Sequence, residues 1–284
     1  MNPGIYDAIP RENYHADSLT EQPALSAGIA CILCQRSPAH ARAAHPRLNP
    51  DFKEKTDKKF DVGQCVHALL LEGKPAEQVI RVVYMDDWRT KAAKELRDEA
   101  RAENRIPLLE KDAEQVYAML DAAKTQLADY QPAPFAFGKP EQTLVWDEDG
   151  IPCKARVDWL RDDYSLAEDF KTATNANPER WTRGSMFDYG YDLQAAFYRR
   201  GIEALTGERA AWRWIVCEKE APFSLVVVEP GADVMTVAEA KVDFALATWR
   251  RCLERDEWPG YSREVVKAEL PAWADDAKWL VEVA

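Results

Sequence analysis

Two acidic residues and a lysine lie where neighbouring strands would bring them together. Asp169 and Lys171 flank Phe170 in the segment LAEDFKT, and Asp158 lies eleven residues before Asp169, in CKARVDWL. That separation suits a hairpin whose two strands lie side by side. Because side chains alternate across a strand, Asp169 and Lys171 share one face and Phe170 points to the other. The pattern predicts two carboxylates and an ammonium group converging on one point.

The apolar residues around these charges indicate what the cluster would do. A buried pair of carboxylates costs free energy unless positive charge balances it. A hydrated divalent cation is therefore the favoured interpretation. The alternative is an α/β protein in which the Asp/Lys pattern is structural and the aspartates serve turns or caps. Metal-induced thermal stabilisation would separate the two, because an ion that binds only the folded state raises the melting temperature.

Hydrophobic periodicity indicates the elements that position these residues. Three strands joined by short turns are expected in the middle of the chain, at 143–146, 153–160 and 164–172, and form a β-meander. Further strands are expected at 79–84, 211–218 and 223–229. Helices are expected at 26–36, 61–73, 88–104, 110–128, 191–205 and 233–255. Strands and helices of this order predict a mixed α/β fold.

Two of the expected helices carry polar residues that could join the cluster. His67 lies four residues after Gly63 in FDVGQCVHALLLEG. Gln194 and Tyr198 lie four residues apart in YDLQAAFYRRG, and so share one face of a helix. The alternatives are a packed core histidine at 67 and polar helix-packing groups at 194 and 198. The residues alone leave these alternatives open.

The acidic residues and the lysine resemble the signature of the PD-(D/E)xK nuclease superfamily. Asp158 matches the first acid, and the segment EDFKT supplies Asp169 and Lys171. Two departures are present: Asp169 stands where many members carry Glu, and Val157 rather than a proline precedes the first acid. The resemblance implies an α/β (α+β) fold with a restriction-endonuclease-like core, in which helices flank a mixed central sheet.

Flanking motifs resemble one branch of that superfamily. Gly63 and His67 match the GxxxH helix of RecB-like nucleases, and Gln194 and Tyr198 match the downstream QxxxY helix. The opening YHADSLTEQPALSAGIACILCQRSPAH is similar to the start of RecE-type exodeoxyribonuclease VIII catalytic domains of phages and prophages. The resemblance implies one nuclease domain over 1–284, with an N-terminal segment and helix (1–60), a catalytic core (61–230) and a C-terminal helix and tail (231–284).

The resemblance also implies a metal site. Mg²⁺, or Mn²⁺ in its place, would be held by the carboxylates of Asp158 and Asp169, the backbone carbonyl of Phe170 and a ring nitrogen of His67. Oxygen-rich ligation with retained waters suits Mg²⁺, and one imidazole makes Mn²⁺ a good substitute. Such an ion lowers the pKa of a bound water and neutralises charge on the scissile phosphate.

Three further residues take catalytic roles by the same resemblance. Lys171 would orient or deprotonate the attacking water and contact the phosphate. Gln194 would position Lys171 or a neighbouring phosphate, and Tyr198 shares its helix face. The implied enzyme is a Mg²⁺-dependent phosphodiesterase hydrolase, an exodeoxyribonuclease that degrades linear double-stranded DNA 5′ to 3′ and leaves a 3′ overhang for recombination by strand annealing.

A 5′-phosphate pocket is expected at the start of the helix at 26–36. Free backbone N–H groups and the helix dipole attract phosphate there, beginning at Ser26, and Arg36 could assist. A plain N-cap explains Ser26 equally well. The residues leave both interpretations open.

Charge and the resemblance bear on partners. With 37 basic and 49 acidic residues, the net charge is −12, which argues against a protein that coats nucleic acid through phosphate neutralisation alone. Processive members of the family encircle DNA ends as rings, so a homo-oligomer, trimeric or tetrameric, is implied. Its channel would be lined by residues such as Arg89, Lys91 and Lys94. A single-strand annealing protein is the usual partner.

The same motifs are compatible with other functions. They are an endonuclease, a Cas4-like or AddB-like nuclease with an iron–sulfur cluster, and an inactive DNA-binding protein on this fold. The cluster needs three closely spaced C-terminal cysteines, whereas only Cys217 and Cys252 lie late in the chain. The Cys31 and Cys34 pair is expected to pack within its helix rather than bind zinc. The inactive alternative predicts loss of an acid or the lysine, and all three are present.

The sequence also predicts a cellular location. Its apolar runs are shorter than the roughly 18 residues that cross a bilayer, and its N-terminus lacks the pattern of a secretory signal. Scattered cysteines suit a reducing compartment. We expect a cytoplasmic protein of a bacterial or phage-infected cell, with no membrane partner.

Overall fold

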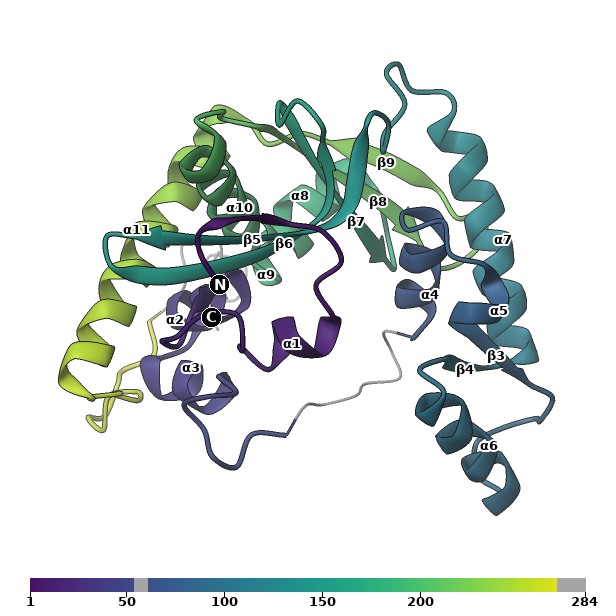
Figure 1. Cartoon of the computed structure of the whole chain (residues 1–284), viewed down its shortest axis with the longest axis horizontal. Helices are drawn as coiled ribbons and strands as arrows, with labels where there is room; N and C mark the ends of the chain where they lie inside the picture. The colour runs from purple at the N-terminus through teal and green to yellow at the C-terminus, as the bar shows by residue number, and fades with distance from the viewer. Residues whose placement is uncertain (54–60, 270–284) are drawn as a thin grey trace, which may run out of the picture.

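A forked sheet lies at the centre of the computed structural model, which describes residues 1–53 and 61–269 (Figure 1). The strand order is β1-β5-β6-β7-β8-β9, with β2 paired to β6. These strands are β1 (Gly4–Tyr6), β2 (Leu25–Ser26), β5 (Gly138–Glu148), β6 (Ile151–Arg161), β7 (Leu166–Ala173), β8 (Ala211–Glu218) and β9 (Leu225–Val228). The β2–β6 and β7–β8 pairs are parallel and the others antiparallel. A separate parallel pair is formed by β3 (Ile80–Val83) and β4 (Ile106–Leu109).

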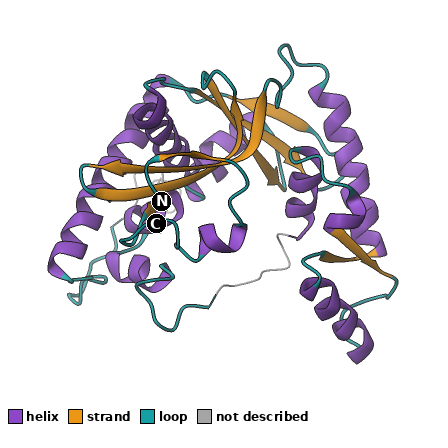
Figure 2. Ribbon diagram, in the orientation of Figure 1, coloured by secondary structure: helices purple, strands orange, loops and turns teal. Residues whose placement is uncertain are grey.

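Helices cover both faces of this sheet (Figure 2). They are α1 (Arg11–His15), α2 (Ala27–Gln35), α3 (Pro38–Ala44), α4 (Asp61–Leu70), α5 (Ala76–Val79), α6 (Lys91–Ala102), α7 (Glu110–Leu127), α8 (Pro178–Arg183), α9 (Ser185–Asp188), α10 (Tyr191–Thr206) and α11 (Ala232–Arg255). The predicted mixed sheet flanked by helices is confirmed. Across the described ranges, no helix is both long and apolar enough to cross a membrane.

Alternating residues of the central strands feed two separate hydrophobic cores. On β8, Trp214 and Val216 pack in a core with α2, α10 and α11. Ile215 and Cys217 point to the other face and pack with α4 and α7. This is the period-2 alternation of a strand buried on both faces. The central strands are therefore fixed in register from both sides.

The sheet forks between β6 and β7. Their ladder contains Leu160 paired with Ala167 and Trp159 paired with Glu168. Past that point β6 continues along β5 and β2, whereas β7 continues along β8. In Figure 1 the long β5–β6 hairpin runs to the left, and β8 and β9 lie to the right. The next residues, Asp158 and Asp169, therefore stand where the two wings part.

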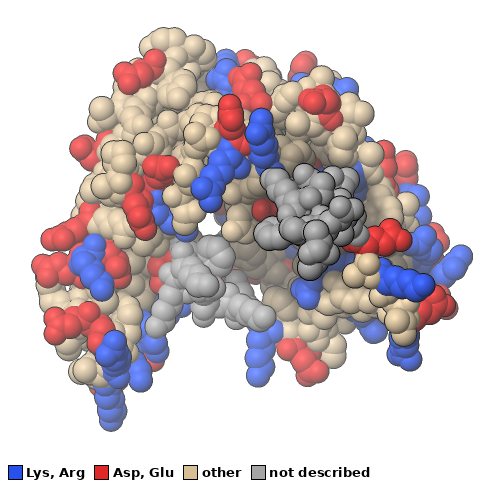
Figure 3. All heavy atoms as spheres, turned by 180° about the vertical axis from the view of Figure 1, so that it is seen from behind, with Lys and Arg blue, Asp and Glu red and all other residues tan. Residues whose placement is uncertain are grey.

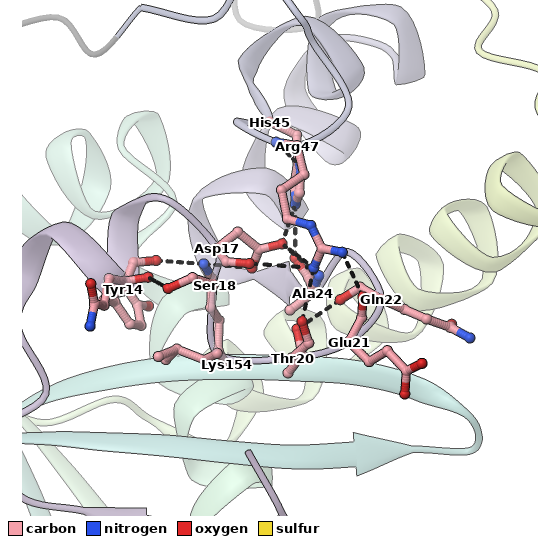
Figure 4. Close-up of polar contacts among 12 residues, drawn as sticks. Tyr14, Asp17, Ser18, Thr20, Glu21, Gln22, Ala24, His45, Arg47 and Lys154 are labelled. Carbon is pink, nitrogen blue, oxygen red and sulfur yellow. Dashed lines mark hydrogen bonds and ion pairs between the residues drawn. The ribbon is translucent and has the colours of Figure 1, made fainter.

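The N-terminal segment is built into the sheet rather than appended to it. Its strands β1 and β2, which the periodicity did not predict, pair with β5 and β6. The buried carboxylate of Asp17 fixes the segment (Figure 4). It lies 2.7 Å from Nζ of Lys154 on β6 and 3.6 Å from Nη1 of Arg47, and accepts a hydrogen bond from the amide of Ala24.

His45 completes this network as a neutral ring. The amide of Arg47 donates to its Nδ1, so Nε2 carries the proton and faces the carbonyl of Ala24 at 3.2 Å. Burial lowers the pKa of His45, although the nearby Asp17 carboxylate acts in the opposite direction. The positive charges that face Asp17 are therefore those of Lys154 and Arg47.

We expect Asp17→Asn to destabilise the fold strongly. The change leaves the ammonium of Lys154, only 6% exposed, without its carboxylate partner, and breaking such a buried pair costs about 3–5 kcal/mol. Urea denaturation would measure the free energy of unfolding. The control is Asp7→Asn, because the pair of Asp7 with Lys139 is exposed and should contribute less than about 1 kcal/mol. Equal losses for both variants would contradict the anchoring role.

Candidate active site

The two predicted acidic residues meet at the fork. Oδ2 of Asp158 accepts a hydrogen bond of 2.9 Å from the amide of Phe170 on β7. This amide lies beyond the last β6–β7 ladder pair, so the carboxylate replaces the strand carbonyl that a longer ladder would supply. The side chain of Asp158 is thereby held against β7, next to Asp169.

Asp169 is completely buried and contacted from two directions. Nζ of Lys171 lies 2.5 Å from its Oδ2. Nε2 of Gln194 on α10 donates to its Oδ1 over 3.3 Å. Phe170, between the two charged residues, packs instead in the core with α4 and α7. The structure thus brings Asp158, Asp169 and Lys171 together as the strand alternation predicts.

His67 reaches the fork from α4. Its Nε2 lies 3.4 Å from Oδ1 of Asp158 and 3.4 Å from Oε1 of Glu141. The helix can approach β7 this closely because residue 63 is glycine: a Cβ atom there would lie 3.1 Å from Oγ1 of Thr172. Gly63 therefore sets the distance between helix and strand, and His67, one turn further on, extends into the fork.

Glu141 on β5 is a site residue that the sequence analysis missed. Its carboxylate faces His67 and also pairs with Nε of Arg156. Its backbone φ of +54° lies in the left-handed region, which costs a non-glycine residue about 1–3 kcal/mol and is concentrated at functional sites. The available signal was a charged residue that follows Pro140 and precedes an apolar strand.

Burial and crowding of charge shift the pKa values of the cluster. Burial lowers the pKa of His67, but the carboxylates of Asp158 and Glu141 outweigh it and raise that pKa to about 9. Burial acts to raise the pKa of Asp158, yet the charge of His67 brings it below its ordinary value. Burial raises the pKa of Asp169 to about 7. The cluster therefore retains protons at neutral pH that a metal ion could replace.

The donor atoms at the fork suit a divalent cation. One nitrogen of His67 and one oxygen each of Glu141 and Asp158 lie within 4.8 Å of one another. An imidazole with carboxylate oxygens is a set that Mn²⁺ accepts, and Mg²⁺ accepts it with retained waters. The two carboxylates carry more negative charge than one imidazole can balance, so a divalent cation would be attracted to the group. The residues present therefore fit the metal ion that the resemblance implies.

The other two predicted metal ligands, Asp169 and the Phe170 carbonyl, already have other partners or neighbours. Asp169 does not belong to this group of three donor atoms, and its carboxylate is paired with Lys171. The predicted carbonyl ligand belongs to Phe170, whose amide is bound by Asp158. Ligation by Asp169 and by this carbonyl stays a prediction.

The two motif residues of α10 lie near Asp169. Nε2 of Gln194 donates to Asp169, and the Gln194 side chain acts to lower the pKa of the Tyr198 phenol. Tyr14 of α1, a second residue missed from the sequence, lies close enough to Tyr198 that the Tyr198 side chain acts to lower the pKa of Tyr14. Burial raises the pKa of both phenols, so both hydroxyls stay protonated. Tyr14 thus brings the N-terminal segment next to the motif residues of α10.

Ser26 and Arg36 are not brought together by the structure. They flank α2, whose nine residues span roughly 13 Å. The Ser26 side chain makes no capping hydrogen bond. Gly28 in the first turn is exposed, with open space where a Cβ atom would stand. The first turn of α2 is therefore exposed at Gly28, and Arg36 lies at the other end of the helix.

The residues expected in a ring channel lie on α6 or just before it. Arg89 and Lys91 are 90% and 92% exposed and pair with Asp87 and Glu95. This helix packs on the β3–β4 pair, away from β6 and β7 (Figure 1). On the face seen from behind the view of Figure 1, acidic and basic side chains are mixed (Figure 3). Arg89, Lys91 and Lys94 therefore do not contribute to the fork.

The CxxC pair contributes to helix packing. Sγ of Cys31 lies 3.5 Å from the carbonyl of Gly190, and Sγ of Cys34 lies 3.4 Å from that of Lys241. Burial raises the pKa of Cys31 to about 12 and that of Cys34 to about 11. Both thiols are therefore protonated, and they join α2 to the start of α10 and to α11.

The mixed sheet flanked by helices, with Asp158, Asp169 and Lys171 brought together on it, has the features that the resemblance to PD-(D/E)xK nucleases implies. The chain belongs to the family described as "PDDEXK-like domain of unknown function (DUF3799)", which matches residues 32–269. The match includes every fork residue from His67 to Tyr198. The resemblance to this superfamily is confirmed.

One solved structure has a similar fold. Described as "Putative exonuclease" from Eubacterium rectale, it is 13% identical with a TM-score of 0.65, and the match covers 94% of this chain and 97% of that chain. A phage related exonuclease from Haemophilus somnus 129PT is 11% identical, with a TM-score of 0.30 and coverage of 85% and 99%. The first similarity shows the fold alone, and the second adds nothing to it. None of the curated proteins matches the sequence.

We expect the stability of the metal-free protein to depend on pH through His67. Its folded-state pKa of about 9 exceeds the ordinary 6.5, so its protonation stabilises the fold below pH 6.5 and this contribution is lost as the pH rises through about 9. In EDTA, His67→Gln should lower the free energy of unfolding by about 2–3 kcal/mol at pH 6 and by much less at pH 10. Urea denaturation at each pH would measure both differences.

The matched control is His15→Gln, at the exposed histidine of α1. Its effect on the free energy of unfolding should be small at both pH values. A His67→Gln effect that is the same at pH 6 and pH 10 would contradict the expected coupling between His67 and the carboxylates.

Proposed function

We propose that this chain is a metal-dependent exodeoxyribonuclease that degrades linear double-stranded DNA 5′ to 3′ and leaves a 3′ single-stranded overhang for strand annealing. The convergence of His67, Glu141 and Asp158 beside the buried Asp169–Lys171 pair carries the proposal. Membership of a PDDEXK-like family and similarity to one structure named "Putative exonuclease" support it. The ring-shaped homo-oligomer and the annealing partner belong to the same proposal and rest on the resemblance alone.

The metal would be Mg²⁺ or Mn²⁺, held by His67, Glu141 and Asp158 with Asp169 and the Phe170 carbonyl as further candidate ligands. When bound, it supplies a water of lowered pKa and positive charge toward the scissile phosphate. The protein contributes a rigid frame for these ligands. Asp158 is fixed by the backbone of β7, and His67 by the close contact of α4 with that strand.

Lys171 is the residue best placed to contact the phosphate. Burial acts to lower its pKa, but the carboxylates of Asp169 and Asp158 outweigh burial and raise that pKa. Lys171 is therefore an ammonium ion, which supports stabilisation of negative charge on the phosphate over abstraction of a proton. Gln194 holds the carboxylate of Asp169 in place. Because Lys171 pairs with the same carboxylate, Gln194 helps to position the ammonium group of Lys171.

The start of α2 is the proposed site for a terminal 5′-phosphate. Gly28 and Cys31 lie three residues apart on one face of this helix. Cys31 contacts Gly190, and the next residue, Tyr191, lies under the ammonium of Lys171. These contacts link the helix that begins after Ser26 to the residues around Lys171. Free amides at the first turn of this helix suit a phosphate dianion.

Digestion of linear double-stranded DNA would test the proposed activity. With Mg²⁺ we expect degradation of a 5′-phosphorylated linear duplex and no degradation with EDTA. Lys171→Ala should reduce the rate by about 10²–10³-fold, as for loss of one preorganised charge-stabilising group. Lys139→Ala, at an exposed lysine paired with Asp7, is the matched control and should cut at the wild-type rate.

A covalently closed circle separates exonuclease from endonuclease action. The proposal requires that the circle survive while the linear duplex is lost. Cutting of the circle would establish an endonuclease instead. No cutting of either substrate, together with no metal-dependent rise in melting temperature, would overturn the nuclease assignment.

End chemistry tests the phosphate site separately. Ser26→Ala should slow degradation of a 5′-phosphorylated duplex by about 10- to 150-fold, since loss of one charge-assisted hydrogen bond costs about 1.5–3 kcal/mol. It should leave a 5′-hydroxyl duplex and the melting temperature nearly unchanged. Equal rates of the wild type on the two ends would count against a 5′-phosphate pocket.

A further inference from the structure

Exposed aromatic rings lie in α9 and in the segment that joins it to α10. Tyr189 is 67% exposed and Phe187 is 38% exposed. Single exposed aromatic residues are common on protein surfaces, so exposure alone indicates little. The neighbours of Tyr189 are what distinguish it.

Tyr189 is the outermost ring of a stack that begins in the core. Buried Trp181 stacks on Tyr191 with ring centroids 5.9 Å apart and an interplanar angle of 16°. Tyr191 in turn contacts Tyr189 at 5.6 Å, with the rings tilted by 34°. The ammonium of Lys171 lies 4.8 Å from the centroid of the Tyr191 ring. Two ring contacts therefore lead from the fork lysine to the exposed face of Tyr189.

Contacts with α2 hold the segment that carries this ring. Nε2 of Gln35 donates to the carbonyls of Phe187 and Asp188, at 3.1 and 3.3 Å. Gly190 has a φ of +68°, and a Cβ atom there would lie 2.5 Å from Sγ of Cys31. Only glycine fits between Tyr189 and Tyr191 in this arrangement. The exposed ring is therefore presented in a fixed position, which reduces the ordering that binding would require.

We propose that Tyr189 is a stacking platform for the base of an unpaired nucleotide next to the phosphate that is cut. This inference rests on the proposed nuclease function and adds the state of its substrate. A base inside a duplex is stacked on both faces by its neighbours, whereas a base at a frayed or single-stranded end can offer one face to a protein ring. Stacking on an aromatic side chain does not depend on which base is present.

The cation beside the stack fits the same ligand. A nucleotide combines a flat apolar base with an anionic phosphate. Tyr189 offers the exposed ring, and Lys171, two contacts away, offers the positive charge. The geometry therefore matches a single nucleotide unit that extends from the fork to the surface.

Binding of single-stranded oligonucleotides would test the platform. Anisotropy of a fluorescein-labelled oligothymidine, with EDTA present to prevent cleavage, measures affinity without catalysis. Tyr189→Ala should weaken binding by about 5- to 150-fold, the range for loss of one base stack. Tyr189→Phe should bind as the wild type, because the ring rather than the hydroxyl carries the contact. Tyr117→Ala, at an exposed tyrosine of α7, is the matched control.

Abasic oligonucleotides locate the contact. An abasic site at one position near the end of the oligonucleotide should weaken its binding to the wild type as much as Tyr189→Ala weakens binding of the intact oligonucleotide. The variant should be indifferent to that abasic site, because the two changes remove the same contact. Independent, additive losses would overturn the proposal, as would equal binding by Tyr189→Ala and Tyr117→Ala.

Kinetics on the linear duplex distinguish failure of this inference from failure of the proposed function. A wild type without metal-dependent cleavage refutes the nuclease function. A wild type that cleaves, with KM unchanged in Tyr189→Ala, refutes the platform alone. A Tyr189→Ala variant whose sedimentation shows a changed oligomeric state would identify the ring as a contact between copies of the chain, which also refutes the platform.

Tyr189→Leu, which keeps apolar bulk but lacks a π face, should behave as Tyr189→Ala.

Discussion

Negative charge buried where two strands part is the constraint on which the rest of this structure depends. Asp169 has no contact with solvent, and Asp158 is mostly covered. Such carboxylates persist only where positive charge and hydrogen-bond donors are supplied. The chain supplies Lys171 from the same strand, His67 from one covering helix and Gln194 from another. The helices are thus required to meet the sheet at this point.

Much of this arrangement could be predicted because it is local in sequence. The hairpin spacing places Asp158 beside Asp169, strand alternation places Lys171 on the same face as Asp169, and helical spacing aligns Gln194 with Tyr198. Each of these relations depends on one strand, one turn or one helix. The structure has all of them, and the mixed sheet flanked by helices as well.

What the sequence could not reveal depends on long-range contacts. Glu141 meets His67 and Arg156, which lie on other elements, and its position after Pro140 was the only signal at the level of sequence. Tyr14 reaches Tyr198 only because β2 pairs with β6 and Asp17 binds Lys154, which are contacts between residues far apart in the chain. Ser26 and Arg36 stand at opposite ends of α2, and a phosphate site there stays a prediction.

The three candidate metal ligands lie on elements that pack in two different hydrophobic cores, so metal binding would couple the unfolding of those cores. His67 belongs to α4, whose apolar residues pack with α7, whereas Asp158 and Glu141 lie on strands whose buried residues pack mainly with α2, α10 and α11. An ion held by all three would connect the two hydrophobic cores, which lie on opposite faces of the strands between them. Metal-free protein would then be able to lose one core before the other in a calorimetric scan, while the loaded protein would unfold in a single transition.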